Sequence, residues 1–275
     1  MGLFFGFVTF DDNLDFNAIG NDLLKSISYF TPNKQKTYSH KNIYLHNSIL
    51  ANRDGLDESA IYETEQFVIA GICRLDNKNE LKNKLNISID LCDMLYILKA
   101  YEKYSNDCLM HLIGDFSFVI WDKINHSIFL AKDQLGIKPL FFALHNNVFY
   151  FATNISSIKA AIKKNLTVNQ YYLATELKNY PQQISETIFN EIKRLKPAHS
   201  ISYGKNGLGD EKKYWDLKKI DVSNFRNEIE ITNEFHRLFS QAIKSRTRTT
   251  KNIAVQLSGG LDSSAITYWL SKLVD

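Results

Sequence analysis

Short apolar runs separated by polar turns fill the first 150 residues of the chain. Branched and aromatic residues dominate each run, which is typical of strands. Two of the connections, at residues 123–125 and 145–147, have the length of a hairpin turn. The pattern therefore predicts a series of strands at residues 2–10, 42–50, 66–75, 115–122, 126–133, 138–145 and 147–154.

Helical spacing interrupts these strands at a few places. An apolar stripe recurs at every third or fourth position from Leu91 to Tyr101, and Asp90 precedes it as a predicted N-cap. Residues 1–215 therefore combine packed antiparallel strands with helices, which is an α+β arrangement. Shorter helices are predicted at residues 106–113, 156–164 and 168–178.

A different order of elements follows. Residues 216–227 are polar and predict a connector, and an apolar stripe from Ile231 to Ile243 predicts a helix. Residues 253–257 predict a short strand buried on both faces, and another helix begins near Ser263. This order is typical of the opening of a parallel α/β domain. Because a lone parallel strand cannot form a sheet, we expect the rest of that domain to lie outside this sequence.

Composition limits the class of protein. Apolar residues make up 44% and charged residues 23%, with a formal net charge of +3, which is typical of a globular protein without a nucleic-acid surface. The first residues lack the positive segment of a signal peptide and are too few to span a membrane. We therefore predict a cytoplasmic protein with no nucleic-acid and no membrane partner.

The cysteines and histidines indicate no metal site. Cys73, Cys92 and Cys108 are each flanked by apolar residues, and their spacing fits neither a disulfide framework nor a zinc cage. They are predicted to be small buried apolar residues. The seven histidines are scattered along the chain, so we expect no metal held by histidine or cysteine.

The stretch Ser258–Ser264 reads Ser-Gly-Gly-Leu-Asp-Ser-Ser and carries the most specific chemistry. Gly259 and Gly260 let the backbone turn tightly and approach a ligand. The N–H groups of the turn and of the following helix then point at an anion, and the serine hydroxyls add donors. A carboxylate at Asp262 repels phosphate unless Mg²⁺ lies between them. The loop therefore predicts a site for phosphate and Mg²⁺.

The loop lacks the lysine of the Walker motif, and a glycine turn capped by serine and aspartate is the structural alternative. Its sequence resembles the pyrophosphatase loop of the N-type ATP pyrophosphatases, which split ATP into AMP and pyrophosphate. That group includes asparagine synthetases, lasso-peptide cyclases and tRNA-modifying ligases. The resemblance implies ATP and Mg²⁺, the metal held by Asp262 through the phosphates. The residues that it assigns to the nucleotide and pyrophosphate are Gln256, Ser258, Gly259, Gly260, Leu261, Asp262, Ser263 and Ser264.

The front part of the chain narrows this choice. Residues 111–162 resemble the second half of the glutaminase-like domain of the asparagine synthetases, and residues 236–264 resemble the start of their synthetase domain. The resemblance covers nearly the whole chain. The matching residues of the front part are Gly114, Phe116, Phe118, Trp121, Asp122, Asp133, Gly136, Pro139, Leu140, Phe151 and Ala152.

This resemblance implies a fold for each part of the chain. Residues 1–215 would form a glutaminase-like N-terminal nucleophile (Ntn) hydrolase domain, an αββα sandwich of two antiparallel sheets between helix layers. Residues 216–227 would be a linker. Residues 228–275 would be the N-terminal fragment of a synthetase domain, the start of an α/β parallel-sheet domain of the adenine nucleotide alpha hydrolase type.

The resemblance also implies what the front domain has lost. In the glutamine-using members a cysteine directly follows the initiator Met and attacks the glutamine amide, and Gly2 holds that place here. Ser48 is the approximate equivalent of the arginine that grips the glutamine carboxylate. Ala70 and Gly71 replace an Asn-Gly oxyanion pair. Asp93 matches the aspartate that binds the glutamine amino group, although it is equally typical of a first helical turn. We therefore predict that glutamine hydrolysis is lost and that Gly71 and Asp93 are vestigial.

A second segment points to one branch of the family. Residues 74–81 read Arg-Leu-Asp-Asn-Lys-Asn-Glu-Leu and resemble a version that is frequent in lasso-peptide cyclases and related ligases without glutaminase activity. Asparagine synthetases more often carry a different segment here. The structural alternative is that Arg74 and Asp76 form a surface ion pair of little energetic weight.

The resemblance implies ATP-dependent amide formation. A substrate carboxylate would attack the α-phosphorus, giving an acyl-adenylate and pyrophosphate, and an amine would then displace AMP. In a lasso cyclase, a precursor peptide supplies both the carboxylate and the amine, and leader-processing proteins accompany it. In an asparagine synthase, aspartate and ammonia react. A tRNA-modifying pyrophosphatase and a non-catalytic scaffold remain as alternatives, and a homodimer is compatible with each.

Overall fold

The chain divides into two compact units, one of residues 1–51 and 58–216 and the other of residues 52–57 and 217–275. The computed structural model describes residues 2–11, 14–50, 61–162, 166–180, 183–219, 221, 223, 225–249 and 252–273.

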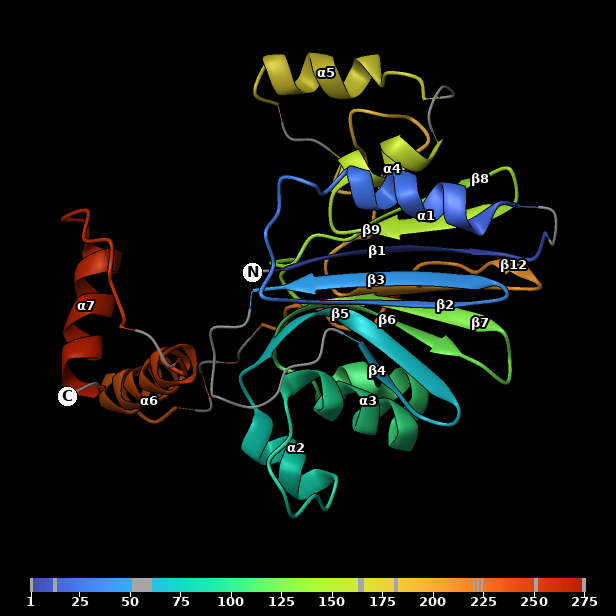
Figure 1. The fold of residues 1–275 in the computed structure, drawn as a ribbon. Helices are drawn as coiled ribbons and strands as arrows, with labels where there is room; N and C mark the ends of the chain where they lie inside the picture. The colour runs from blue at the N-terminus through green and yellow to red at the C-terminus, as the bar shows by residue number, and fades with distance from the viewer. Residues whose placement is uncertain are drawn as a thin grey trace. The chain divides into compact units, whose positions relative to one another are not determined.

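Two antiparallel sheets form the centre of the first unit (Figure 1). Within the described ranges, the first sheet has six strands, in the order β10 (Lys193–Arg194), β8 (Phe141–His145), β9 (Val148–Ala152), β1 (Gly2–Thr9), β3 (Ile43–Ile49) and β2 (Lys34–His40). The second has seven there, in the order β12 (Gly207–Leu208), β11 (His199–Gly204), β7 (Ser127–Lys132), β6 (Gly114–Asp122), β5 (Phe67–Leu75) and β4 (Ile61–Glu63), with β13 (Lys212–Lys213) also paired to β11.

Helices cover the outer face of each sheet (Figure 1). The six-stranded sheet packs against α1 (Phe16–Lys25) and α4 (Ile155–Ile162). The seven-stranded sheet packs against α2 (Lys78–Lys84), α3 (Asp93–Tyr104) and the 3₁₀ helix η1 (Ser105–His111). The order helix, sheet, sheet, helix is the αββα sandwich that the family resemblance implies.

The alternation of side chains along β1 explains these layers. Phe4 and Val8 point into the core between the two sheets, whereas Phe5 and Phe7 point into the core beneath the helices. Successive residues of a strand face opposite sides, so an almost continuously apolar strand is required where both faces are covered. All four side chains are fully buried.

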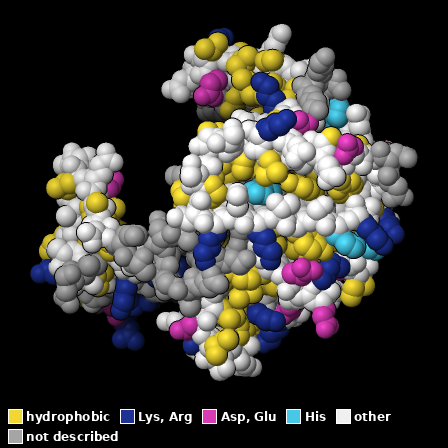
Figure 2. All heavy atoms as spheres, viewed as in Figure 1, with side chains coloured by type: hydrophobic (Ala, Val, Ile, Leu, Met, Phe, Trp, Pro, Cys, Tyr) yellow, Lys and Arg dark blue, Asp and Glu magenta, His cyan; other side chains and the backbone are white. Residues whose placement is uncertain are grey.

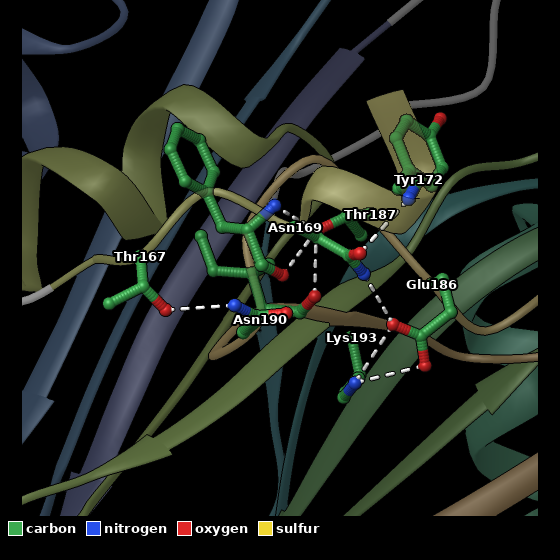
Figure 3. A network of polar contacts seen from close by, with 9 residues as sticks. Thr167, Asn169, Tyr172, Glu186, Thr187, Asn190 and Lys193 are labelled. Carbon is green, nitrogen blue, oxygen red and sulfur yellow. Dashed lines mark hydrogen bonds and ion pairs between the residues drawn. The ribbon is translucent and has the colours of Figure 1, made fainter. Parts of the chain in front are cut away.

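Polar side chains hold the segment that carries α5 (Gln170–Leu177), as Figure 3 shows. Asn169 caps this helix by accepting a hydrogen bond from the backbone N–H of Tyr172 at 3.0 Å, and its amide donates to Glu186 at 2.9 Å. Glu186 in turn pairs with Lys193 of β10 at 3.0 Å. These contacts tie α5 to the edge of the six-stranded sheet.

The second unit is built differently. It contains α6 (Glu228–Arg246) and α7 (Leu261–Leu273), which touch through the rings of Phe239 and Trp269. Among the described residues of these two helices, Ile243 is the one buried side chain. The predicted helices are therefore confirmed, but the described part of this unit has almost no core.

The predicted strand at residues 253–257 is wrong for this structure. Residues 252–258 form no strand and are exposed, because the described part of the second unit offers no neighbouring strand whose N–H and C=O groups could pair with theirs. The remaining predicted strands and helices are present, and the helix predicted at residues 106–113 is formed as η1.

The predicted cap at Asp90 is also wrong. Helix α3 begins at Asp93, and its N-cap is Cys92, which makes no side-chain hydrogen bond to the helix. Asp90 lies three residues before the helix, too early for an N-cap, and instead accepts a hydrogen bond from Lys82 at 2.6 Å. No helix in the described part of the chain is long and apolar enough to cross a membrane.

Candidate functional site

The loop Ser258–Ser264 leads directly into the N-terminus of α7. Gly259 has a φ of +82°, a left-handed conformation that glycine adopts without strain. A Cβ added at Gly259 would meet no atom within 4 Å. The requirement for glycine here is therefore conformational, and the space beside the loop is open.

Three serine hydroxyls line this turn. The Oγ atoms of Ser258 and Ser263 lie 3.1 Å apart, and the hydroxyl of Ser264 donates to the carbonyl oxygen of Gly260 at 2.8 Å. The first backbone hydrogen bond of α7 runs from the N–H of Ser264 to Gly260 at 3.1 Å. The N–H groups of residues 261–263 precede Ser264, the first intrahelical donor, so they are available to an anion.

Asp262 lies in the first turn of α7 and is exposed, as are Leu261 and Gln256. Seven of the eight residues assigned to the nucleotide are thus exposed, and Ser263 is half-buried. N–H groups and hydroxyls are donors that fit phosphate oxygens, and the Asp262 carboxylate is a ligand that Mg²⁺ accepts beside phosphate. The donor set of the loop therefore fits a magnesium–phosphate ligand.

Gly2 lies at the start of β1, opposite Ile49 of β3, in a closed environment. A Cβ added at Gly2 would lie 2.9 Å from the carbonyl oxygen of Ser48 and 3.3 Å from side-chain atoms of Ile49 and Ile72. The first of these contacts is with backbone, which cannot move aside cheaply. A side chain at position 2 therefore needs a shift of β1 or β3.

Ser48, the predicted equivalent of the arginine that binds the glutamine carboxylate, is fully buried. It belongs to a row of uncharged, hydrogen-bonded side chains. Its hydroxyl lies 2.7 Å from Nε2 of His46, whose Nδ1 lies 2.8 Å from the hydroxyl of Thr37. Burial lowers the pKa of His46 to about 4, so this imidazole is uncharged at neutral pH. The three hydrogen-bonded side chains are uncharged, so none of them places a positive charge beside Gly2.

Gly71 has a role in packing the two sheets. Its carbonyl oxygen accepts a hydrogen bond of 2.8 Å from the amide of Asn47, which reaches across from β3. A Cβ added at Gly71 would lie 2.5 Å from the carbonyl oxygen of Ser117 on the neighbouring strand β6. Glycine is therefore required at position 71 by the close approach of the Ser117 backbone.

Asp93 is buried and engaged by the chain itself. One carboxylate oxygen accepts a hydrogen bond of 3.0 Å from the backbone N–H of Leu75, and the other lies 3.5 Å from the ammonium of Lys78. The ammonium of Lys78 thus faces the carboxylate to which the family resemblance assigns a substrate ammonium. Lys78 was not predicted, because one lysine in a polar stretch gives no signal of its partner.

The ion pair of Arg74 and Asp76 differs from the predicted surface pair. The two side chains lie 3.9 Å apart and are only 19% and 12% exposed. The predicted buried state of the three cysteines, Cys73, Cys92 and Cys108, is confirmed. Within the described ranges, no group of three or more histidine, cysteine or acidic side chains could hold a metal ion.

Comparison with known families gives two matches along the chain. A model described as a glutamine amidotransferase domain matches residues 2–215, and one described as asparagine synthase matches residues 234–275. The first of these covers well over half of the chain. The boundary between them falls in the segment that joins the two units.

Two curated proteins are similar to about two thirds of the chain. Asparagine synthetase [glutamine-hydrolyzing] 3 of Bacillus subtilis (strain 168) is 30% identical over 194 residues, which is 70% of this chain and 31% of that protein. Amidase chry2 of Gibberella zeae is 29% identical over 185 residues, which is 66% of this chain and 27% of that protein. The chain therefore spans less than a third of the length of these relatives.

Among solved structures, the glutamine phosphoribosylpyrophosphate amidotransferase from B. subtilis, complexed with ADP and GMP, matches with a TM-score of 0.52. The match covers 79% of this chain and 50% of that one at 12% sequence identity. At that identity the likeness concerns the fold alone, and it shows that the first unit has the Ntn-type amidotransferase fold.

Proposed function

The chain belongs to the asparagine synthetase family, and on that premise we propose that it is part of an ATP-dependent ligase whose front unit does not hydrolyse glutamine. The observation that carries the proposal is the contrast between a closed position 2 and an open, exposed loop at residues 258–264. The chemistry is the joining of a carboxylate to an amine.

The proposed reaction has two steps. A carboxylate oxygen of the substrate bonds to the α-phosphorus of ATP, and the bond from that phosphorus to the pyrophosphate oxygen breaks. The amine nitrogen then bonds to the acyl carbon, the bond to AMP breaks, and the nitrogen gives a proton to solvent. The N–H groups of residues 261–263 and the hydroxyl of Ser258 would stabilise the charge that develops on the departing pyrophosphate.

Asp262 has a separate role in this proposal. A carboxylate among phosphate-binding donors is unfavourable unless a cation lies between the two, so Asp262 is the residue that would hold Mg²⁺. The metal, when bound, would neutralise phosphate charge and so favour departure of pyrophosphate. Asp262 is exposed at the first turn of α7, where it can reach such a cation.

Three features support loss of glutamine hydrolysis in the front unit. Gly2 has no nucleophilic side chain, and the carbonyl oxygen of Ser48 crowds the place that one would occupy. Ser48 binds a neutral imidazole rather than a substrate carboxylate. The Asp93 carboxylate is shared between a backbone N–H and the ammonium of Lys78. The interactions that would recognise glutamine are thus replaced by interactions within the chain.

The finer proposal concerns the substrate. The missing nucleophile and the Arg-Leu-Asp-Asn segment favour a lasso-cyclase-like ligase, in which a precursor peptide supplies the carboxylate and its own N-terminal amine. Similarity to an asparagine synthetase favours the second candidate, in which aspartate reacts with ammonia. In either case ammonia from glutamine is not made in the front unit.

The test measures AMP and pyrophosphate formation from ATP by the 275-residue chain and by a longer protein that carries it. We expect AMP formation to need a carboxylate and an amine, and to fall about 100-fold or more in Asp262→Ala, because a loss of metal and charge stabilisation of roughly 3 kcal/mol has that effect. Asp210→Asn, at another exposed aspartate, is the control and should leave the rate unchanged. A longer protein that never forms AMP would contradict the ligase proposal.

The glutaminase part is tested separately. Neither the natural chain nor Gly2→Cys should release glutamate from glutamine, because a cysteine at position 2 meets the backbone of β3 and lacks the substrate-binding groups. Glutamate release by the natural chain would overturn this part of the proposal, and release by Gly2→Cys would show that the remaining pocket is intact.

A further inference from the structure

A cavity lies in the first unit, at the other end of the sandwich from Gly2. It has a volume of about 240 Å³ and lies between the β2–β3 turn, β4 and the β6–β7 turn. Asn42 at its edge is seven residues along β3 from Ile49, the partner of Gly2, which corresponds to about 23 Å at the rise of a strand. The cavity is therefore separate from the site already described.

Basic side chains surround this cavity from two hairpins. His40 and Lys41 come from the β2–β3 turn, and Lys123 and His126 come from the β6–β7 turn. Figure 2 shows histidine beside lysine or arginine side chains at the right-hand side of the molecule, where these hairpins end in Figure 1. Two groups of N–H donors thus face one small space.

One acid, Glu63, also lines the cavity, and its charge is balanced. The ammonium of Lys123 lies 3.2 Å from its carboxylate and also donates to the carbonyl oxygen of Thr64. Lys41 and the two imidazoles are then left to face a ligand. Burial, with a smaller contribution from Glu63, raises the pKa of Tyr38, so this phenol at the cavity stays protonated and can donate.

Both hairpin turns hold one of these basic residues in the left-handed region of the backbone. Lys41 has a φ of +42° and His126 a φ of +48°, in the left-handed region that costs a non-glycine residue roughly 1 kcal/mol or more. Histidine, like asparagine and aspartate, occurs in this region more often than most residues, whereas lysine does not. Lys41 therefore holds a turn position that glycine or asparagine would occupy at lower cost, and it places a positive charge at the cavity.

From these observations we propose that the cavity binds a small phosphate-type oxyanion. Lysine binds phosphate as a point charge, and Lys41 and the imidazoles of His40 and His126 offer N–H donors from two hairpins. Donors from two opposing hairpins suit a tetrahedral anion, which accepts hydrogen bonds from several directions. The volume is below the roughly 300–1,000 Å³ that is typical of larger organic ligands, so inorganic phosphate or pyrophosphate fits better than a nucleotide.

The experiment is calorimetric titration of the 275-residue chain with inorganic phosphate, pyrophosphate and succinate, together with amide NMR shifts. We expect phosphate or pyrophosphate to bind with a Kd of about 1 mM or tighter, to bind better than succinate, and to shift the signals of His40, Lys41 and His126. The double variant Lys41→Gly with His126→Asn should weaken binding about tenfold or more, because both replacements suit a positive φ while removing the basic groups.

Lys178→Gln is the matched control, since it removes one exposed positive charge at the end of α5, which is tied to β10 at the opposite edge of the six-stranded sheet from β2. It should change the Kd less than twofold. Failure of both phosphate and pyrophosphate to shift these signals would overturn the proposal, as would tighter binding of succinate. Equal weakening by the control and the double variant would also overturn it, because it would reveal only a general effect of charge. Asp262→Ala should leave this binding intact, which separates it from the loop at residues 258–264.

Discussion

Gly2 and Gly259 differ in what surrounds them. A Cβ at Gly2 would lie 2.9 Å from the backbone of β3, whereas a Cβ at Gly259 would meet nothing within 4 Å. The two units differ in the same way: Phe149 of β9 is fully buried, and Phe235 of α6 is 58% exposed. Position 2 of the first unit is thus closely packed, while the second unit presents the loop at residues 258–264 and apolar side chains such as Phe235 to solvent.

The largest expected effect concerns the two aromatic residues. Phe149→Ala should lower the free energy of unfolding of the first unit by about 3–5 kcal/mol, because it opens a cavity in the core between the sheets. Phe235→Ala should change the stability of the second unit by only about 0.5 kcal/mol, since most of that ring already faces water. Urea unfolding followed by near-ultraviolet circular dichroism measures both.

A large loss of stability in Phe235→Ala would contradict the difference between the two units, because it would mean that this face of α6 is buried in solution. Phe7→Ala is a second check on the first unit, as Phe7 fills the core beneath α1. It should be as costly as Phe149→Ala.

Next in size is the pH dependence of the first unit. Burial lowers the pKa of His46 to about 4, whereas in the unfolded chain it titrates near 6.5. Above pH 6.5 both states are neutral and the stability is complete. As the pH falls from 6.5 to 4, the unfolded state takes up the proton first, so the free energy of unfolding should drop by about 3 kcal/mol from this group. Denaturant titrations at several pH values measure the drop.

His46→Gln is the control for that titration, because glutamine can hydrogen-bond to Thr37 and Ser48 but does not titrate. The variant should lose most of the pH dependence between pH 6.5 and 4. If the natural chain and His46→Gln follow the same curve, the imidazole is not held neutral in the fold.

The first and second units also differ in how well their secondary structure could be predicted from the sequence. The strands of the first unit were predicted because their residues are apolar on both faces, as in β1 and β6. Strand β2 was missed because it is almost entirely exposed and polar, and it forms only because β3 lies beside it. Residues 253–257 have the composition of a strand but no partner in the described part of their unit, so composition alone could not decide their structure.

The candidate sites show the same limit. The loop at residues 258–264 could be recognised from sequence because glycine, serine and aspartate occur together in a fixed order. The ammonium of Lys78 could not, because its partner Asp93 lies on another helix and the two meet only when the helices pack. His46 and Ser48 are two residues apart on β3, so the alternation of a strand brings them together, but the neutral state of the imidazole comes from burial in the folded unit. A fixed local order of residues can be recognised in a sequence, whereas contacts and burial that depend on the whole fold cannot.

A smaller effect is expected at the pair of Asp93 and Lys78. Lys78→Met removes the cation and leaves a buried carboxylate with the N–H of Leu75, which should cost about 2 kcal/mol of the free energy of unfolding. Lys82→Met is the matched control, because Asp90, its partner, is 71% exposed and such pairs contribute about 0–1 kcal/mol. Thermal unfolding of the two variants distinguishes them. Equal losses would mean that Lys78 does not occupy a buried position in solution.

The smallest effect on stability is expected at Gly259. Gly259→Ala forces alanine into a φ of +82° and should cost about 1 kcal/mol, yet it should abolish binding of magnesium pyrophosphate by the loop, because the N–H groups of residues 261–263 lose their alignment. Gly207→Ala is the control: this glycine has a φ of +92°, also with no atom within 4 Å of an added Cβ, but it is the first residue of β12. Both variants should carry the same conformational cost, measured by thermal unfolding. With the cavity site removed by Lys41→Gly and His126→Asn in all the chains compared, only Gly259→Ala should lose calorimetric binding of magnesium pyrophosphate. Retention of that binding would mean that the glycine serves the turn and not the ligand.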